Sequence, residues 1–199
     1  MENNLVTIKG LVTKCEFSHE THEEKFYKLN VNVYRQSGIL DEIPVLVSEN
    51  VFIDIAFLQN QNVEINGEFR SHNQEVDGKR KLILSVLAKT ISFSVENEFS
   101  NDITLNAFIC KPPILRTTPL GKTVCDLLVA VNRKTRKSDY IPCIIWGKNA
   151  KIAGKLNVGD NIIINGRIQS RKYTKNNETR TAYEVSINDL HKVQEEIEL

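Results

Sequence analysis

The sequence has few of the residues and segments that mark several large protein classes. Its 199 residues include only 9 Gly and 5 Pro, too few for a collagen-like or low-complexity chain. No apolar run approaches the roughly 20 residues of a membrane-spanning helix, and the start MENNLVTIKG lacks a signal-peptide core. We therefore expect a soluble, cytoplasmic protein with no membrane partner, long enough for one large domain or two of about 100 residues.

Cysteine is also scarce, and its spacing excludes two kinds of site. The four cysteines (Cys15, Cys110, Cys125 and Cys143) form no CxxC pair, so neither a zinc site nor a disulfide framework is expected. Each lies in or beside an apolar run, where a free thiol behaves as a small core residue. The segment HETHEE (19–24) lies between two strand patterns, which favours a solvated hairpin turn over a metal site.

Motifs for catalysis are missing as well. The sequence contains no P-loop, no GxSxG elbow and no HExxH motif. Paired carboxylates are frequent, but none stands out from ordinary surface charge. The sequence therefore predicts no catalytic residues, no metal, no cofactor and no enzymatic activity.

The overall balance of 26 basic and 25 acidic residues hides a difference between the two halves. Residues 1–98 carry 10 Lys+Arg and 15 Asp+Glu, a net charge of −5, whereas residues 99–199 carry 16 and 10, a net charge of +6. Such a division indicates two domains, of which only the second suits a polyanionic partner.

The charge boundary coincides with an internal repeat. Residues 29–44 align without gaps with residues 127–142, and seven of the sixteen positions are identical. Three further blocks match in the same order, namely 5–10 with 102–107, 63–71 with 162–170, and 82–86 with 183–187. The repeat predicts two similar domains in tandem, an acidic one at 1–98 and a basic one at 99–199.

Each repeat has the pattern of a small β-barrel. Alternating runs rich in Val, Ile and Tyr predict five strands in the second half, at 102–109, 124–132, 140–146, 161–171 and 182–187. A segment with helical spacing, 148–160, lies between the third and fourth strands, and 51–58 takes that position in the first half. This order is typical of the OB-fold, a partly open Greek-key barrel. We expect a mainly all-β chain of two tandem five-stranded OB barrels; an SH3-like barrel or a small sandwich is the alternative.

The second half resembles the OB domain of bacterial single-stranded-DNA-binding proteins through PPILRTTPLGKTVCDLLVAVNR, DYIPCIIWGKNA, VGDNIIINGRIQSRKY and AYEVSI. The first half resembles the same fold more distantly through EKFYKLNVNVYRQSG, DEIPVLVSE and VEINGEFRSHN. The resemblance implies non-enzymatic coating of single-stranded DNA on the nucleoid during replication, recombination and repair, alongside proteins of those processes. It also implies assemblies that display four OB domains, so a chain with two is expected to form a homodimer.

Proteins that bind single strands combine a basic groove with exposed aromatic rings, on which each stacked base gains about 1–3 kcal/mol. Alternation along 139–146 places Tyr140 and Trp146 on the face opposite Ile141. Along 161–173 the outward positions are Arg167, Gln169, Arg171 and Tyr173. We expect bases to stack on Tyr140, Trp146 and Tyr173. Phosphates are expected to be bound by Arg116, Arg133, Arg136, Lys137, Lys148, Arg167, Arg171 and Lys175.

Plainer explanations exist for several of these residues. Trp146 suits a barrel mouth or a dimer contact as well as a stacking site, and the loop RKTRK (133–137) suits a solvated hairpin. Arg35 and Arg133 recur in both repeats, so a hydrogen bond that supports the fold explains them as well as a phosphate contact does. Two alternative functions follow: a protein-interaction module, such as a replication-restart or conjugation accessory protein, or a single-stranded RNA binder.

The first half lacks the aromatic residues of the second. The positions aligned with Tyr140, Trp146 and Tyr173 are Glu42, Ser48 and Gln74. We therefore expect the first domain to serve dimerisation, partner binding or a weak extension of the nucleic-acid path. The short acidic end EEIEL (195–199) is expected to be a frayed helix and not a partner-recruiting tail.

Overall fold

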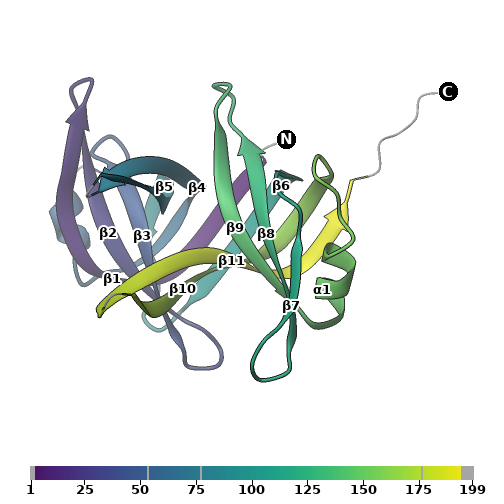
Figure 1. The fold of residues 1–199 in the computed structure, drawn as a ribbon. Coiled ribbons are helices and arrows are strands. Elements are labelled where there is room, and N and C mark those ends of the chain that lie inside the picture. Colours follow the sequence, from purple (N-terminus) through teal and green to yellow (C-terminus); the bar gives the residue numbers. More distant parts are fainter. Residues whose placement is uncertain (1–2, 53, 77, 176, 194–199) are drawn as a thin grey trace. The chain divides into compact units, whose positions relative to one another are not determined.

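Alternating apolar residues form strands through almost the whole chain, which Figure 1 shows as a computed structural model. It describes residues 3–52, 54–76, 78–175 and 177–193, so the end EEIEL lies outside the described residues. Within those ranges, helical structure is limited to one short α-helix and one 3-10 turn, and neither is long or apolar enough to span a membrane. The expected all-β class is confirmed.

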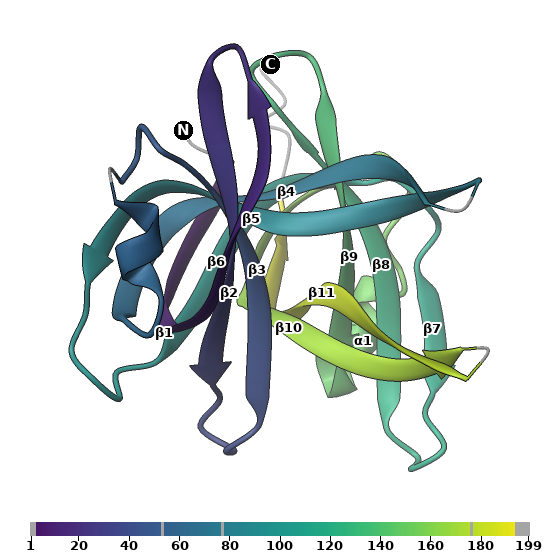
Figure 2. The ribbon, with the colours of Figure 1, turned by 90° about the vertical axis from the view of Figure 1, so that its left-hand side faces the viewer.

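The first half forms one closed OB barrel. Its elements are β1 (Asn4–Thr21), β2 (Glu24–Tyr34), β3 (Leu40–Ser48), the 3-10 helix η1 (Ile55–Leu58), β4 (Asn62–Val76) and β5 (Lys79–Phe93). Strand β1 pairs with both β2 and β4, while β3 and β5 close the barrel in parallel, with Val45 opposite Val86. Beyond the barrel, β1 and β2 continue as a long two-stranded ribbon (Figure 2).

The second half repeats this barrel. Its elements are β6 (Ser100–Ile109), β7 (Ile114–Thr117), β8 (Thr123–Asn132), β9 (Ser138–Trp146), α1 (Gly147–Ala153), β10 (Asn161–Lys175) and β11 (Glu178–Lys192). Strands β9 and β11 close it in parallel, with Cys143 opposite Val185. Strand β7 was not expected, because Pro112-Pro113 precedes it and all four of its residues are exposed, so it has no apolar alternation.

The strands form two compact units, and each unit combines segments from both halves of the sequence. The C unit consists of Met1–Asn4, Ile103–Arg167 and Glu184–Leu199, and the N unit consists of Leu5–Asp102 and Ile168–Tyr183. The outer part of the β10–β11 hairpin therefore belongs to the same compact unit as the first barrel. The predicted domains, 1–98 and 99–199, remain a prediction about which segments fold alone.

Both barrels contain a glycine at which two neighbouring strands come unusually close together. Gly67 of β4 and Gly166 of β10 lie so near the next strand that a Cβ would come within 2.3 Å of a carbonyl oxygen. Glycine is required at both positions because it alone has no Cβ. The asparagine before each glycine accepts a hydrogen bond from a threonine of the neighbouring strand, Thr7 Oγ1 to Asn66 Oδ1 at 2.7 Å and Thr104 Oγ1 to Asn165 Oδ1 at 2.9 Å.

A second shared feature is a buried carboxylate at the start of the third barrel strand. Asp41 and Asp139 are both fully buried. Arg35 donates to Asp41 through Nε at 2.6 Å and Nη2 at 2.7 Å. Arg133 donates to Asp139 through the same two atoms, the Nε contact measuring 2.8 Å. These arginines therefore fix the β2–β3 and β8–β9 connections, as the fold-supporting alternative predicts.

Candidate nucleic-acid interface

Strand β9 presents two large aromatic side chains to solvent. Tyr140 is 46% exposed and Trp146 is 43% exposed, whereas Ile141, Cys143 and Ile145 on the other side are buried. The alternation holds for the two rings, but Ile144, which lies on the same predicted side, is buried as well. The two rings lie six residues apart, about 20 Å along an extended strand.

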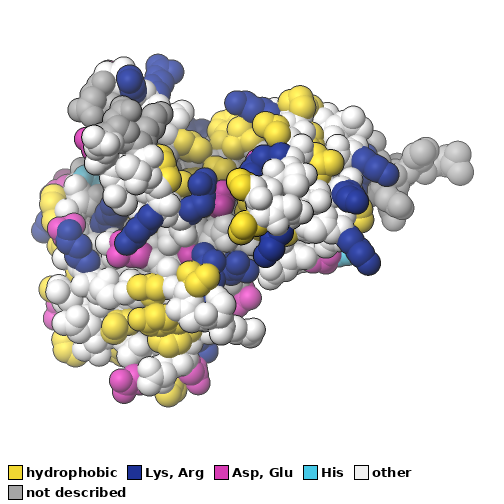
Figure 3. Space-filling model, turned by 60° about the horizontal axis from the view of Figure 1, so that its bottom comes forward, with side chains coloured by type: hydrophobic (Ala, Val, Ile, Leu, Met, Phe, Trp, Pro, Cys, Tyr) yellow, Lys and Arg dark blue, Asp and Glu magenta, His cyan; other side chains and the backbone are white. Residues whose placement is uncertain are grey.

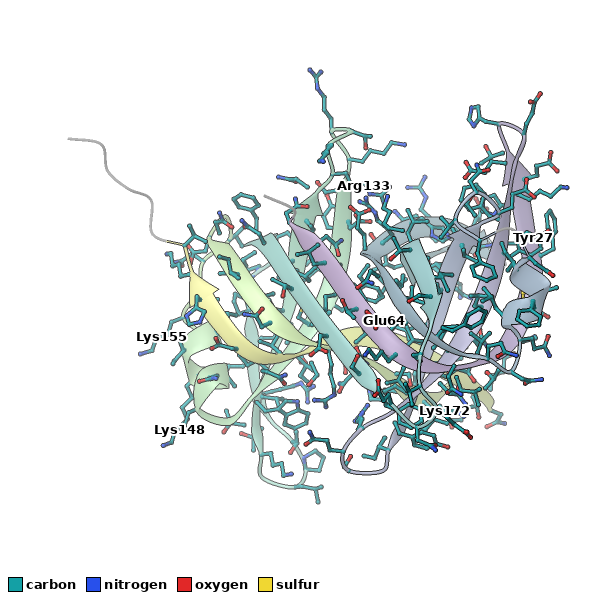
Figure 4. All side chains as sticks on the ribbon, turned by 180° about the vertical axis from the view of Figure 1, so that it is seen from behind. Tyr27, Glu64, Arg133, Lys148, Lys155 and Lys172 are labelled. Atoms are coloured by element: carbon teal, nitrogen blue, oxygen red, sulfur yellow. The ribbon has the colours of Figure 1, made fainter. Side chains whose placement is uncertain are left out.

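The chain turns sharply directly after Trp146, which keeps this ring at the barrel surface. Gly147 has a φ of 68°, in the left-handed region that glycine adopts without strain, and it starts helix α1. Lys148 follows in the first turn of α1 with an exposed side chain (Figure 4). A cation thus lies two residues from the tryptophan at the end of β9.

Four other predicted phosphate-binding residues of the C unit fall into two groups. Arg136 and Lys137 are exposed in the β8–β9 turn. Arg133, in contrast, is held by Asp139, and Arg116 of β7 donates to Asp126 through Nη2 at 3.0 Å and through Nε. The Asp126 hydrogen bonds raise the pKa of Arg116 above its ordinary value. The two paired arginines are therefore already engaged by carboxylates.

Strand β10 divides the predicted stacking face between the two units. Arg167 is half-buried in the C unit, and its Nε is shielded from solvent. Arg171 and Tyr173 are exposed but belong to the N unit, where Tyr173 is 37% accessible. Lys175 ends β10, and its side chain lies outside the described residues.

Gln169 corrects the predicted outward face of β10. The sequence places it outward, but its side chain is only 8% exposed. Gln169 lies in Ile168–Tyr183, the part of the hairpin that belongs to the N unit. On this side of β10, Asn165 and Arg171 are exposed and Arg167 is half-buried, so Gln169 is a buried position between accessible ones.

The exposed cations lie among exposed apolar groups. In the view of Figure 3, dark blue Lys and Arg side chains and yellow hydrophobic ones are both exposed. Such a mixture suits a ligand that combines phosphates with flat apolar rings.

The β1–β2 ribbon carries aromatic residues that the sequence analysis missed. Phe17 packs edge-on against Tyr27 with ring centroids 5.8 Å apart, and His19 stacks on Phe26 at 5.0 Å. Comparison of the repeats did not find them because they do not align with the aromatics of the second half. The HETHEE segment forms the expected hairpin turn, and the described residues contain no group of three or more His, Cys, Asp or Glu suited to a metal.

All four cysteines are free thiols. Cys125 and Cys143 are buried, while Cys15 and Cys110 are half-buried. Burial raises the pKa of Cys143 far above its ordinary value, which keeps that group a neutral thiol. Burial also raises the pKa of Cys15, Cys110 and Cys125, which disfavours the thiolate form at these positions.

Comparison with known proteins finds similarity to single-strand binding proteins over the second half of the chain. Residues 100–193 match the model of the single-strand binding protein family. A single-stranded DNA-binding protein of Halalkalibacterium halodurans is 37% identical to this chain over 90 residues, which cover 42% of this chain and 53% of that protein. The single-stranded DNA-binding protein 2 of Listeria monocytogenes is 36% identical over 87 residues, which cover 40% of this chain and 54% of that protein. The chain thus spans about half the length of these curated relatives.

A solved structure extends the likeness to both barrels. The single-stranded DNA binding protein from Thermus aquaticus superposes with a TM-score of 0.79 at 21% sequence identity, covering 97% of this chain and 93% of that one. At this identity the match shows the fold, a tandem OB architecture. The second half therefore resembles the single-strand binding protein family over residues 100–193, and the chain shares the tandem OB fold of the Thermus aquaticus structure.

Proposed function

We propose that the chain binds single-stranded DNA without strong sequence preference and without catalysing a reaction. The observation that carries the proposal is the exposed pair Tyr140 and Trp146 on β9, within the residues that match the family model. Every base has a flat apolar face, so stacking on these rings tolerates any sequence. In this role the protein would protect single strands on the nucleoid in the cytoplasm during replication, recombination and repair.

Phosphates are bound, in this proposal, mainly by exposed cations of the C unit. Arg136 and Lys137 of the β8–β9 turn and Lys148 of α1 are exposed and support this role. Arg116 and Arg133 are assigned to positioning β7 and the β8–β9 turn, because Asp126 and Asp139 already accept their hydrogen bonds. Arg167, Arg171 and Tyr173 complete the proposed set along β10, followed by Lys175.

Titration with oligonucleotides tests the proposal directly. Trp146 is the only tryptophan, so its fluorescence reports on the proposed stacking site. We expect strong quenching by oligo-dT and little by duplex DNA, because paired bases have no free faces. Binding should weaken as salt rises, with a log–log slope of about −0.7 for each phosphate neutralised.

Oligo-U serves as the control for sugar discrimination in the same titration. Equal quenching by oligo-U would show that stacking does not distinguish RNA from DNA. Absence of both quenching and competition would contradict the proposal and favour the protein-interaction module, as would binding to partner proteins with no dependence on salt.

We also propose a homodimer, because two chains with two OB barrels each display the four OB domains that the family resemblance implies. Light scattering at micromolar concentration should give twice the mass of the 22.7 kDa chain. A monomer under those conditions would contradict this part of the proposal and leave DNA binding unaffected.

A further inference from the structure

Three phenylalanines of the N unit, Phe52, Phe57 and Phe93, form a cluster that we refer to as the phenylalanine patch. The ring of Phe93, at the end of β5, lies at its centre. The rings of Phe52 and Phe57 both pack edge-on against it, with centroid distances of 5.9 Å and 6.0 Å. Phe57 belongs to η1, whose coil lies at the outside of the first barrel in Figure 2. The patch therefore joins two segments that are far apart in the sequence.

The patch is exposed although the segments that carry it are anchored in the core. Ile55 and Leu58 of η1 are buried, whereas Phe57 between them is 58% exposed. Phe93 is 53% exposed, and its backbone is fixed by pairing with Val63 of β4. Rings that are already held against one another lose little conformational freedom when a partner covers them, which favours binding.

The second barrel carries an ion pair at the position of the central ring. In each barrel the amide that follows the last strand donates to the carbonyl oxygen of the first residue of β4 or β10, at 2.9 Å in both cases: Ser94 to Asn62 and Val193 to Asn161. The last residues of β5 and β11, Phe93 and Lys192, are therefore equivalent. Lys192 lies 2.7 Å from Asp160 in an ion pair. The OB barrel thus does not itself require an aromatic residue at this point.

The charge beside the patch is negative. The two segments that form the patch contain four acidic residues and no Lys or Arg: 49–60 and 90–98. Glu98 is paired with Lys9 of β1 at 3.4 Å, whereas Asp54 and Glu96 have exposed side chains. Carboxylates repel the phosphates of a nucleic acid and attract the Lys and Arg side chains of a protein. The charge therefore favours a basic partner for this patch.

We propose that the phenylalanine patch is a docking site for a partner protein, through a basic peptide segment with apolar side chains. The apolar side chains of that segment cover the three rings, and its Lys or Arg side chains pair with Asp54 and Glu96. Aromatic residues are the usual anchors of protein interfaces, and complementary charges beside them select the partner. This site is independent of the proposed DNA binding, because Tyr140 and Trp146 belong to the C unit.

Three labelled synthetic peptides of equal length test this chemistry on the full chain. The first alternates Lys with Leu, the second has Glu in place of each Lys, and the third has Ser in place of each Leu. We expect only the Lys–Leu peptide to raise its fluorescence anisotropy, with an affinity that falls as salt screens the carboxylates. Nuclear magnetic resonance should place the largest shifts of backbone amides around Phe57 and Phe93.

Variants separate the rings from the charges. Phe57→Ala/Phe93→Ala should weaken binding of the Lys–Leu peptide at least about 30-fold, and the milder Phe57→Ala at least about fivefold, as for aromatic hot spots. Asp54→Asn/Glu96→Gln keeps the rings and should reduce the salt dependence. Phe17→Ala is the matched control, because Phe17 is 59% exposed in the same unit but lies outside the patch. Circular dichroism confirms that each variant is folded before binding is compared.

Each outcome has a distinct meaning. Equal affinity of the unchanged chain and the Phe57→Ala/Phe93→Ala variant for the Lys–Leu peptide would overturn the inference, as would equally tight binding of the Glu–Leu peptide. Absence of peptide binding by the unchanged chain would overturn it too, and a lower mass of the variant in light scattering would then assign the patch to a contact between two copies. Failure of the unchanged chain to bind oligo-dT would refute the proposed function and leave the docking site unaffected.

Discussion

Replacing Tyr140 and Trp146 together with alanine is expected to weaken oligo-dT binding by at least about 30-fold, since each lost stacking base costs about 1–3 kcal/mol. Both rings are nearly half exposed, so their removal changes the binding surface much more than the core. The free energy of unfolding should change little, because exposed side chains contribute about 0.5 kcal/mol or less. Anisotropy of a labelled oligonucleotide measures the affinity without the tryptophan.

Phe57→Ala is the matched control for this double variant. Phe57 is also an exposed aromatic residue, but it lies on η1 of the first barrel and packs against Phe93. Its loss should leave oligo-dT affinity unchanged. If the Tyr140→Ala/Trp146→Ala variant bound as tightly as the unchanged chain, base stacking on β9 would be excluded as the source of affinity.

Replacing Arg133 with alanine is expected to lower the free energy of unfolding by about 3 kcal/mol, near the lower end of the cost of breaking a buried ion pair. The reason is that Asp139 is fully buried and would lose its paired cation. The lower end is expected because Arg133 itself lies partly at the surface, where water screens its charge. Urea denaturation followed by circular dichroism measures the change.

The same variant separates the two explanations of Arg133. If the arginine only supports the fold, the salt dependence of oligo-dT binding at low temperature should keep its slope. A phosphate contact would instead reduce the slope by about 0.7 and leave stability nearly intact. Lys137→Ala, on the same turn, is the control that should reduce the slope with little effect on unfolding.

The barrels were predictable because burial imposes a period of two on each strand. Leu29 and Leu127, like Ile43 and Ile141, occupy aligned positions and are buried alike, so the repeat and the alternation pointed to the same fold. Strand β7 carried no such signal, since its residues are exposed and its pairing with β8 depends on backbone hydrogen bonds and the Arg116–Asp126 ion pair.

The position of a site residue was predictable where it depends on alternation within one strand. It was not predictable where it depends on contacts between segments far apart in the sequence. Tyr140 and Trp146 follow from alternation within β9 alone. The placement of Arg171 and Tyr173 depends on the Ser170 amide donating to Asp41, 129 residues earlier, and a backbone amide leaves no pattern of charge or hydropathy in the sequence. The aromatic pairs of the β1–β2 ribbon were missed because the second half has no counterparts with which to compare them.

The sharing of the β10–β11 hairpin has an evolutionary consequence. In a simple tandem duplication either copy can be lost, since the survivor retains all of its own parts. Here the compact unit of the first barrel includes Ile168–Tyr183 from the second copy. Deleting the second repeat would therefore remove Ile168–Tyr183 from the N unit. Deleting the first repeat would remove the rest of the compact unit to which that hairpin belongs. Selection for a folded product would then keep both copies in one gene, even after their surfaces have diverged as far as the acidic first half has.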